Sequence, residues 1–477
     1  MNLILDLKFI LPEIILTVAA VFALLFDLII KDKSLIAYFI LAALTLALLY
    51  LAGIPHINLN LFSGMLVSDA IALFFKILSV CIAIIVMLIS FDYKEISAAY
   101  RAEFYCLLLL ITCAMMLLAG SNNLLMIYLG IEFLGLISYV IAAYWRGNLK
   151  SSEAGLKYFL IGAASSITML YGISLLYGLT GSLDLSLINS ILSKSNFSPA
   201  VISVVMLTVL IGLGLKIAMV PVHFWCPDVY EGAPTPVTAF FSVGPKIAGF
   251  AVLLRFLFVG SVFFSQHWTH LLAILSVLTM IVGNFTALSQ TNIKRLLAYS
   301  SIAHAGYALI GLVVGKGIGQ ASLFVYLITY TIMNLGAFAG VIAVSNQIKS
   351  DEIKDYAGLS SRAPYLAAAL AVFLLSLAGI PPLAGFIGKF YIFSASIKEG
   401  FTDLAIAAAI NSVIAAYYYF NIIRTMYFMP APASFKIKPS LSLNLALAIT
   451  LIFILAIGVY PKPIIDFAYN SLSVIAH

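Results

Sequence analysis

Three lysines lie near the middle of long apolar stretches of the sequence: Lys216, Lys246 and Lys389. A charged lysine at the centre of a bilayer costs roughly 3 kcal/mol on insertion scales. Three such lysines would cost about 9 kcal/mol if neither a partner nor water stabilised them. Ionisable groups inside a membrane commonly mark ion and proton pathways. We therefore expect these lysines to carry charge across a membrane.

A carboxylate, Glu132, lies at the centre of another apolar segment. A Glu–Lys pair in a medium of low dielectric stabilises the charged forms of both partners. Separation of the pair removes this stabilisation and favours release of the lysine's proton. We therefore predict a proton relay that contains Glu132, Lys216, Lys246 and Lys389.

Three further residues are candidates for the same relay: Lys157, His223 and His304. Lys157 follows Glu153 by four residues, which is also the spacing of an ordinary ion pair on a helix surface. His223 comes two residues after Pro221, and His304 lies in the middle of an apolar segment. Imidazole titrates near neutral pH, so both histidines could connect the lysines through water. A hydrogen bond between helices is the alternative interpretation of His304.

The composition identifies a membrane protein. The chain has 477 residues, of which 63% are hydrophobic and 9% are charged, whereas a soluble domain carries about 25% charged residues. Apolar runs long enough to cross a bilayer give about fourteen spans. Lipid offers no hydrogen-bond partner to an open strand, so these spans must be helices. We predict an all-α polytopic membrane protein without a separate soluble domain.

Two of the spans contain prolines that a continuous helix does not tolerate. Pro221 interrupts the seventh span (201–225), and Pro381 and Pro382 interrupt the twelfth (366–397). Proline removes a backbone donor and breaks the helical hydrogen-bond ladder, so we predict that both spans are discontinuous. Paired interrupted segments in two halves of a chain are typical of inverted-repeat transporters.

Each break lies about midway through a block of five spans, and the two blocks give four predicted regions. Residues 1–100 form a three-helix region, and 101–260 form a first half-channel repeat of five spans. Residues 261–430 form a second repeat of five spans, inverted relative to the first, and 431–477 form a final helix.

Basic residues are distributed unequally between alternate loops. One side carries most of them, and the other carries only Lys8, Lys194, Lys316, Lys398 and Lys462. The positive-inside rule assigns the rich side to the cytoplasm. An even number of spans then places both termini on the periplasmic side of a bacterial inner membrane. Two basic residues near span ends, Lys76 and Arg255, are expected to snorkel to the interface.

The sequence shows no site for a metal or a redox cofactor. The cysteines form no CxxC pair, and no cluster of thiolates or imidazoles has the spacing of a zinc or iron–sulfur site. No phosphate-binding or dinucleotide-binding motif occurs in a suitable context. We therefore expect no cofactor in this chain, and we expect the energy for transport to come from an exchanged ion or from partner subunits.

Five stretches carry a more specific signal, and they cover both predicted repeats: YLGIEFLGLISYVI (128–141), SSEAGLKYFLIGAASSITMLYG (151–172), GLGLKIAMVPVHFWCPDVYEGAPTPVTAFFSVGPKIAGF (212–250), ALSQTNIKRLLAYSSIAHAGY (287–307) and LAGIPPLAGFIGKFYIF (377–393). With these stretches the chain resembles the antiporter-like membrane subunits of bacterial respiratory complex I, the proton-translocating NADH:quinone oxidoreductase. These subunits are related to Mrp-type Na⁺/H⁺ antiporters.

The resemblance implies roles at matching positions. Glu132 is similar to the carboxylate that gates the first half-channel, and Lys216 to its partner on the first broken helix. Lys246 resembles the lysine that connects the halves. Lys389 matches a lysine on the second broken helix, where subunit M has a glutamate, and no long lateral helix of the subunit L type follows the last span. The resemblance is therefore to the subunit N family.

The resemblance also implies a function. The chain would be a proton-translocating subunit of an enzyme whose NADH, FMN, iron–sulfur clusters and quinone (such as ubiquinone) belong to partner subunits. Its partners would be the other antiporter-like and small membrane subunits and the lipid bilayer, and no nucleic acid. An Mrp-type cation/H⁺ antiporter subunit is the first alternative. A structural scaffold whose buried charges only fix helix register is the second.

Overall fold

The computed structural model describes residues 3–55, 57–93, 100–145, 147–194, 197–260, 265–315, 317–431 and 437–472. In chain order the elements are α1 (Leu3–Phe9), α2 (Leu11–Ile29), α3 (Lys33–Ala52), β1 (Leu59–Leu61), η1 (Phe62–Gly64), β2 (Leu66–Ser68), α4 (Ala70–Ser90), α5 (Arg101–Gly120), α6 (Leu124–Ala142), α7 (Leu149–Thr180), α8 (Leu185–Lys194), α9 (Pro199–Ile217), α10 (Trp225–Gly232), α11 (Thr235–Arg255), η3 (Phe256–Gly260), α12 (Ser265–Ala287), α13 (Ile293–Val314), α14 (Ile318–Ile348), η5 (Ile353–Tyr356), α15 (Leu359–Arg362), α16 (Pro364–Ala378), α17 (Ala384–Lys398), α18 (Thr402–Phe428), α19 (Leu441–Val459) and α20 (Lys462–Asn470). The all-α prediction is confirmed, apart from a short antiparallel hairpin of β1 and β2.

The number of membrane crossings agrees with the sequence. Thirteen described helices are long and apolar enough to cross a membrane, and the shorter apolar helix α16 completes a fourteenth crossing together with α17. An even number of crossings puts the two ends of the described chain on one side of the membrane. Which side this is stays a prediction, and Lys316 of the orientation argument lies outside the described residues.

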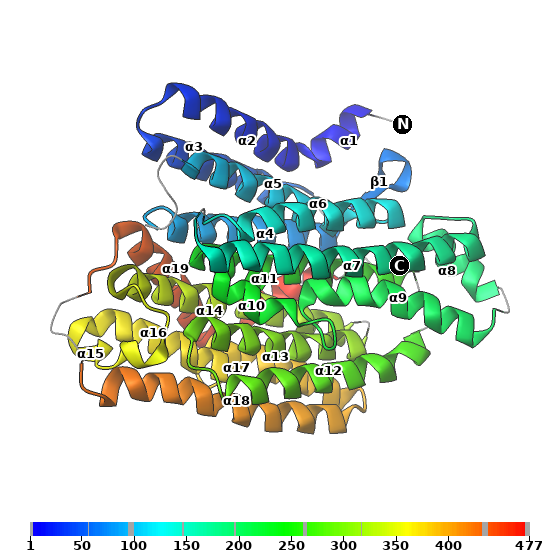
Figure 1. Cartoon of the computed structure of the whole chain (residues 1–477). Helices are drawn as coiled ribbons and strands as arrows, with labels where there is room; N and C mark the ends of the chain where they lie inside the picture. Colours follow the sequence, from blue (N-terminus) through cyan, green and yellow to red (C-terminus); the bar gives the residue numbers. More distant parts are fainter. Residues whose placement is uncertain are drawn as a thin grey trace.

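The helices form a bundle with a buried centre. Figure 1 shows them running side by side, with α2 and α3 along one edge, α18 along the opposite edge, and α11 and α14 between them. The apolar windows of α11, α13 and α14 are almost entirely buried, whereas about a third of those of α2, α3, α18 and α19 is buried. Ionisable residues on α11 and α13 therefore lie at the centre of the protein, away from the lipid-facing edges.

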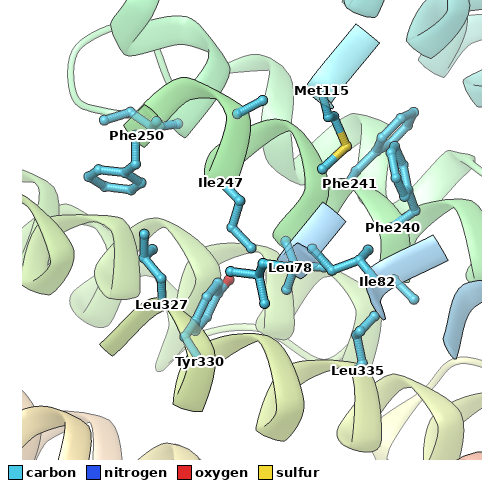
Figure 2. Packing of buried hydrophobic residues seen from close by; sticks show 14 of the residues in the cluster. Leu78, Ile82, Met115, Phe240, Phe241, Ile247, Phe250, Leu327, Tyr330 and Leu335 are labelled. Atoms are coloured by element: carbon cyan, nitrogen blue, oxygen red, sulfur yellow. The ribbon is translucent and has the colours of Figure 1, made fainter. Parts of the chain in front are cut away.

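The core holds α11 in place through close packing. Figure 2 shows side chains of α11 packed among those of three other helices: Leu78 and Ile82 of α4, Met115 of α5, Phe240, Phe241, Ile247 and Phe250 of α11, and Leu327, Tyr330 and Leu335 of α14. Lipid tails are as apolar as these side chains, so van der Waals packing, rather than removal from water, holds such helices together. Lys246 precedes Ile247 on this closely packed helix.

The two predicted helix breaks are confirmed. Helix α9 ends at Ile217, where Ala218 adopts a left-handed conformation (φ 58°), and α10 begins at Trp225 after an irregular loop. Helix α16 ends before Gly379, which is also left-handed (φ 90°), and α17 begins at Ala384. The peptide bonds that precede Pro221 and Pro382 are cis. The first break begins earlier than the predicted span 201–225 implied.

Corresponding elements occur in the same order on either side of residue 260. Helices α6 and α13 are both capped at the N-terminus by an asparagine side chain, Asn123 and Asn292. Helices α7 and α14 have 32 and 31 residues, and a broken span follows each of them. This order supports two blocks of five crossings. Because five is odd, the second block begins on the opposite side of the membrane from the first. The region boundaries and the inverted symmetry stay predictions.

Candidate functional site

Lys216 lies at the first break, in the last turn of α9, and is 3% exposed. Its ammonium group approaches α6 at Gly135, where an added Cβ would lie 2.9 Å from Nζ. Because Gly135 has no side chain, the Lys216 ammonium can lie this close to α6. The Nζ atom also lies 5.7 Å from the centroid of the Tyr139 ring, within the range of a cation–π interaction.

Glu132 lies on the same face of α6 as Gly135, one helical turn earlier. Its carboxylate is half-buried and accepts a hydrogen bond from the Ser166 hydroxyl of α7. In the described part of the chain, Lys216 forms no ion pair within 4.0 Å, although Glu132 acts on it electrostatically. The structure thus brings the predicted partners to the same face of α6 without an ion pair between them in the described residues.

Lys246 lies in the middle of α11, directly after Pro245, and is 1% exposed. Its ammonium donates to both the backbone oxygen and the hydroxyl oxygen of Ser301 on α13, at 2.5 Å each. The Ser301 hydroxyl lies 3.3 Å from the hydroxyl of Tyr230 on α10. Lys246 therefore connects the first broken span with a helix of the second block.

His304 lies one turn after Ser301 on α13, between two tyrosine hydroxyls. Its Nδ1 is 2.6 Å from the hydroxyl of Tyr326 on α14, and its Nε2 is 3.4 Å from the hydroxyl of Tyr419 on α18. Tyr419 in turn shares a hydrogen bond with Ser300. A neutral imidazole donates from one nitrogen and accepts at the other, and a hydroxyl does both. This arrangement can therefore pass a proton without leaving a charge on the imidazole.

Lys389 lies at the second break, in the second turn of α17, and is 3% exposed. Its ammonium donates to the backbone oxygens of Leu377 and Ala378 at 3.0 Å each and to the Ser412 hydroxyl at 2.8 Å. These carbonyls belong to the last turn of α16, where no helical N–H is available to them. The lysine therefore caps α16, at the helix end where a positive charge is favoured.

His223 is not joined to the lysines. It lies in the loop of the first break, with Nδ1 3.3 Å from the backbone oxygen of Pro221 in the same loop. Its ring packs 4.5 Å from that of Phe224. In the described residues no hydrogen bond links His223 to Lys216, and its role in the relay stays a prediction.

Lys157 belongs to a charged cluster around a cavity of about 190 Å³ at one end of α7, α10 and α13. Its Nζ lies 2.8 Å from a carboxylate oxygen of Glu153 and 2.7 Å from one of Asp228. Asp228 also pairs with Arg295 at 2.6 Å, as does Glu231 at 3.2 Å. The ion pair of Lys157 with Glu153, predicted from their spacing, is confirmed, and Asp228 is a second partner of Lys157. Because the Lys157 side chain is 42% exposed, this cluster lies outside the buried series of lysines.

The exposure of this cluster limits its expected contribution. A double-mutant cycle of Lys157→Gln and Asp228→Asn should give a coupling energy of about 0.2–1 kcal/mol, because water screens such pairs. Thermal unfolding of the purified protein at low and high salt measures it, with the more exposed pair Lys150–Glu231 as a comparison. A coupling above about 3 kcal/mol that persists in high salt would show a buried ion pair instead.

Two buried ion pairs were not expected from the sequence. Lys76 lies 2.6 Å from Glu13 of α2, and Arg255 binds both carboxylate oxygens of Asp69 at 2.7 and 3.0 Å. The two basic residues are 7% and 2% exposed. The prediction that they snorkel is therefore wrong, because each has a carboxylate partner on a distant segment.

Comparison with known proteins identifies the family. A family model described as "NADH:quinone oxidoreductase/Mrp antiporter, TM" matches residues 121–415, which include all the candidate relay residues. The chain belongs to this family. A protein of Trichlorobacter lovleyi named NADH-quinone oxidoreductase subunit N is 43% identical over 478 residues, which cover 98% of each chain. A protein of the same name from Rhodospirillum rubrum is 42% identical, covering 88% of this chain and 87% of that one.

Two solved structures have the same fold. A chain of Thermus thermophilus respiratory complex I with bound aureothin is 33% identical, with a TM-score of 0.81 over 95% of this chain and 98% of that one. A chain of the Mrp complex of Dietzia sp. has a TM-score of 0.84 over 99% and 97% of the two chains, at 20% identity. The second similarity concerns the fold alone.

Proposed function

We propose that this family member is the N-type proton-translocating membrane subunit of an NADH:quinone oxidoreductase. The observation that carries the proposal is the buried series of Lys216, Lys246, His304 and Lys389, at the two helix breaks and on the helices between them, with the half-buried Glu132 on α6 beside the first break. The names of relatives that are 42–43% identical support the same assignment.

The geometry suggests an order for the relay. A proton received at Glu132 and Lys216 beside the first break passes to Lys246. We propose that it continues from Ser301 through the hydroxyls around His304 to Lys389 at the second break. Unwound backbone at both breaks leaves carbonyl groups that attract water into the membrane interior. Regions 101–260 and 261–430 are then the two half-channels, framed by 1–100 and 431–477.

The energy source lies outside this chain in our proposal. The described residues contain no group of three His, Cys, Asp or Glu side chains that could hold a metal ion. NADH, FMN, iron–sulfur clusters and quinone would be bound by partner subunits, and the whole assembly would be an H⁺-translocating oxidoreductase. We place it in a bacterial inner membrane, with both termini on the periplasmic side, because basic residues concentrate in the opposite loops.

Replacement of Lys216 tests the proposal. In the assembled complex, Lys216→Ala should lower the number of protons moved per electron by about threefold or more, since a positioned proton-transfer group is lost. Electron transfer from NADH to a soluble artificial acceptor should stay unchanged. The control is Lys194→Ala, at an exposed position on α8. An unchanged proton-to-electron ratio in Lys216→Ala would contradict the relay.

The alternative, an Mrp-type antiporter subunit, is supported by the similar fold of the Dietzia chain. It ranks second because 20% identity says nothing about the transported ion. Proteoliposomes that contain only this chain separate the two functions. An imposed Na⁺ gradient should produce no change of internal pH, whereas robust Na⁺/H⁺ exchange would favour the antiporter.

A further inference from the structure

A cavity of about 700 Å³ lies between the N-terminal ends of α16 and α19. Its polar lining, which includes Arg362 and Lys438, lies at and just before the first turns of these helices. Deeper along both helices the lining is apolar: Leu366 and Ala369 on α16, and Leu447, Ala448 and Leu451 on α19. Its volume is in the range of ligand sites, and none of the candidate relay residues lines it.

The mouth of this cavity carries positive charge. Arg362 is 5% exposed, and its guanidinium is fixed by donation to the backbone oxygens of Asp355 and Ala357 at 2.8 and 2.9 Å. Lys438 is exposed, and no carboxylate side chain lines the cavity in the described ranges. The nearby Asp355 carboxylate accepts a hydrogen bond from Ser350 and also acts electrostatically on Arg362, so Lys438 is the exposed cation of the mouth. The N-terminal ends of α16 and α19 add partial positive charge.

The position in the membrane restricts what can occupy such a cavity. Its basic mouth lies on the face whose loops are rich in lysine and arginine, and its apolar part follows two spans towards the hydrocarbon. Basic pockets between membrane helices on that face recognise anionic lipid headgroups. A soluble anion would match the mouth but would leave the apolar part unfilled.

We propose that this cavity binds an anionic glycerophospholipid, with its phosphate between Arg362 and Lys438 and an acyl chain between α16 and α19. The site has a structural link to the relay. Helix α16 begins at the lipid phosphate and ends at the carbonyls that hold Lys389. A bound lipid therefore anchors the half-helix on which Lys389 depends.

A photoreactive phosphatidylglycerol tests the proposal on the intact complex in nanodiscs. Peptide mapping should locate crosslinks in residues 359–372 and 437–451. Lys438→Gln should reduce this crosslinking about fivefold, because a basic residue at the membrane surface contributes about that factor. Ala448→Trp, at an exposed position on α19, should fill the groove and also reduce it severalfold. Neither variant alters a buried side chain, so both should assemble.

The control variant is Lys354→Gln, an exposed lysine on the same face that does not line the cavity. Unlabelled phosphatidylglycerol should compete, whereas phosphatidylcholine and inorganic phosphate should not. Equal competition by phosphatidylcholine would overturn the headgroup assignment, and displacement by phosphate would indicate an ion site. No crosslinking at these peptides would overturn the lipid site, and this is also the result expected if a partner subunit covers the cavity. Unchanged crosslinking in both variants would overturn it as well.

Discussion

Replacement of Lys246 by methionine is expected to lower proton pumping by the assembled complex about tenfold or more. Methionine keeps the length of the side chain but removes the charge, and a positioned proton-transfer group typically contributes at least that factor. Lys246 bonds across the two blocks to Ser301 from the middle of α11, whereas Lys294 bonds across them at the N-terminal end of α13. Quenching of a pH-sensitive dye in NADH-energised vesicles measures the effect, normalised to the amount of assembled complex.

Lys294→Met is the matched control for this variant. Lys294 is a second buried lysine, 4% exposed, that donates to the backbone oxygens of Glu231 and Ala233 at 2.8 and 2.7 Å. It lies at the end of α13, outside the relay series, so its loss should weaken stability but preserve pumping per complex. If Lys246→Met and Lys294→Met pump equally well, Lys246 is a structural residue and the scaffold alternative gains.

Replacement of Lys389 by methionine should have two separable effects. Pumping should fall about tenfold, because the relay group at the second break is lost. Stability should fall by about 2–5 kcal/mol, since charge-assisted hydrogen bonds to Leu377, Ala378 and Ser412 disappear and the carbonyls stay buried. Hydrogen exchange at residues 374–383 reports the loss of the cap, and vesicle acidification reports the pumping.

Lys398→Met provides the comparison on the same helix, because Lys398 is exposed at the end of α17. It should change neither measurement. Faster exchange with normal pumping in Lys389→Met would leave the lysine only a capping role. Normal hydrogen exchange together with lost pumping in Lys389→Met would show that the C-terminal end of α16 does not depend on the lysine cap.

The sequence predicted the breaks and the buried charges for a simple physical reason. Prolines such as Pro221 remove a backbone donor wherever they stand, and a lysine in an apolar run is conspicuous in any fold. The first break nevertheless begins at Ala218, before the proline, because the helix ends with a left-handed residue there. Such local geometry depends on packing and leaves no clear signal in composition.

The groups that hold the relay could not be predicted from the sequence. Ser166, Ser301 and Ser412 contact Glu132, Lys246 and Lys389, respectively, yet serine is common in membrane helices and carries no special spacing. The tyrosines around His304 come from two other helices, and only the tertiary fold brings them to one imidazole. The same limit explains Arg255, whose partner Asp69 is 186 residues away.

The hydrogen bonds of Lys389 make the conformation of the second break depend on the protonation state of this lysine. An ammonium group has three N–H donors, and here all three find acceptors: two carbonyls of α16 and one hydroxyl of α18. A neutral amine has only two N–H donors and one lone pair. When the proton leaves, either one carbonyl loses its donor, or the Ser412 hydroxyl turns from Ala378 to donate to the nitrogen. The hydrogen bonds at the C-terminal end of α16 therefore depend on whether Lys389 is protonated. A change in its protonation can shift this helix end and, through it, the helices packed against it.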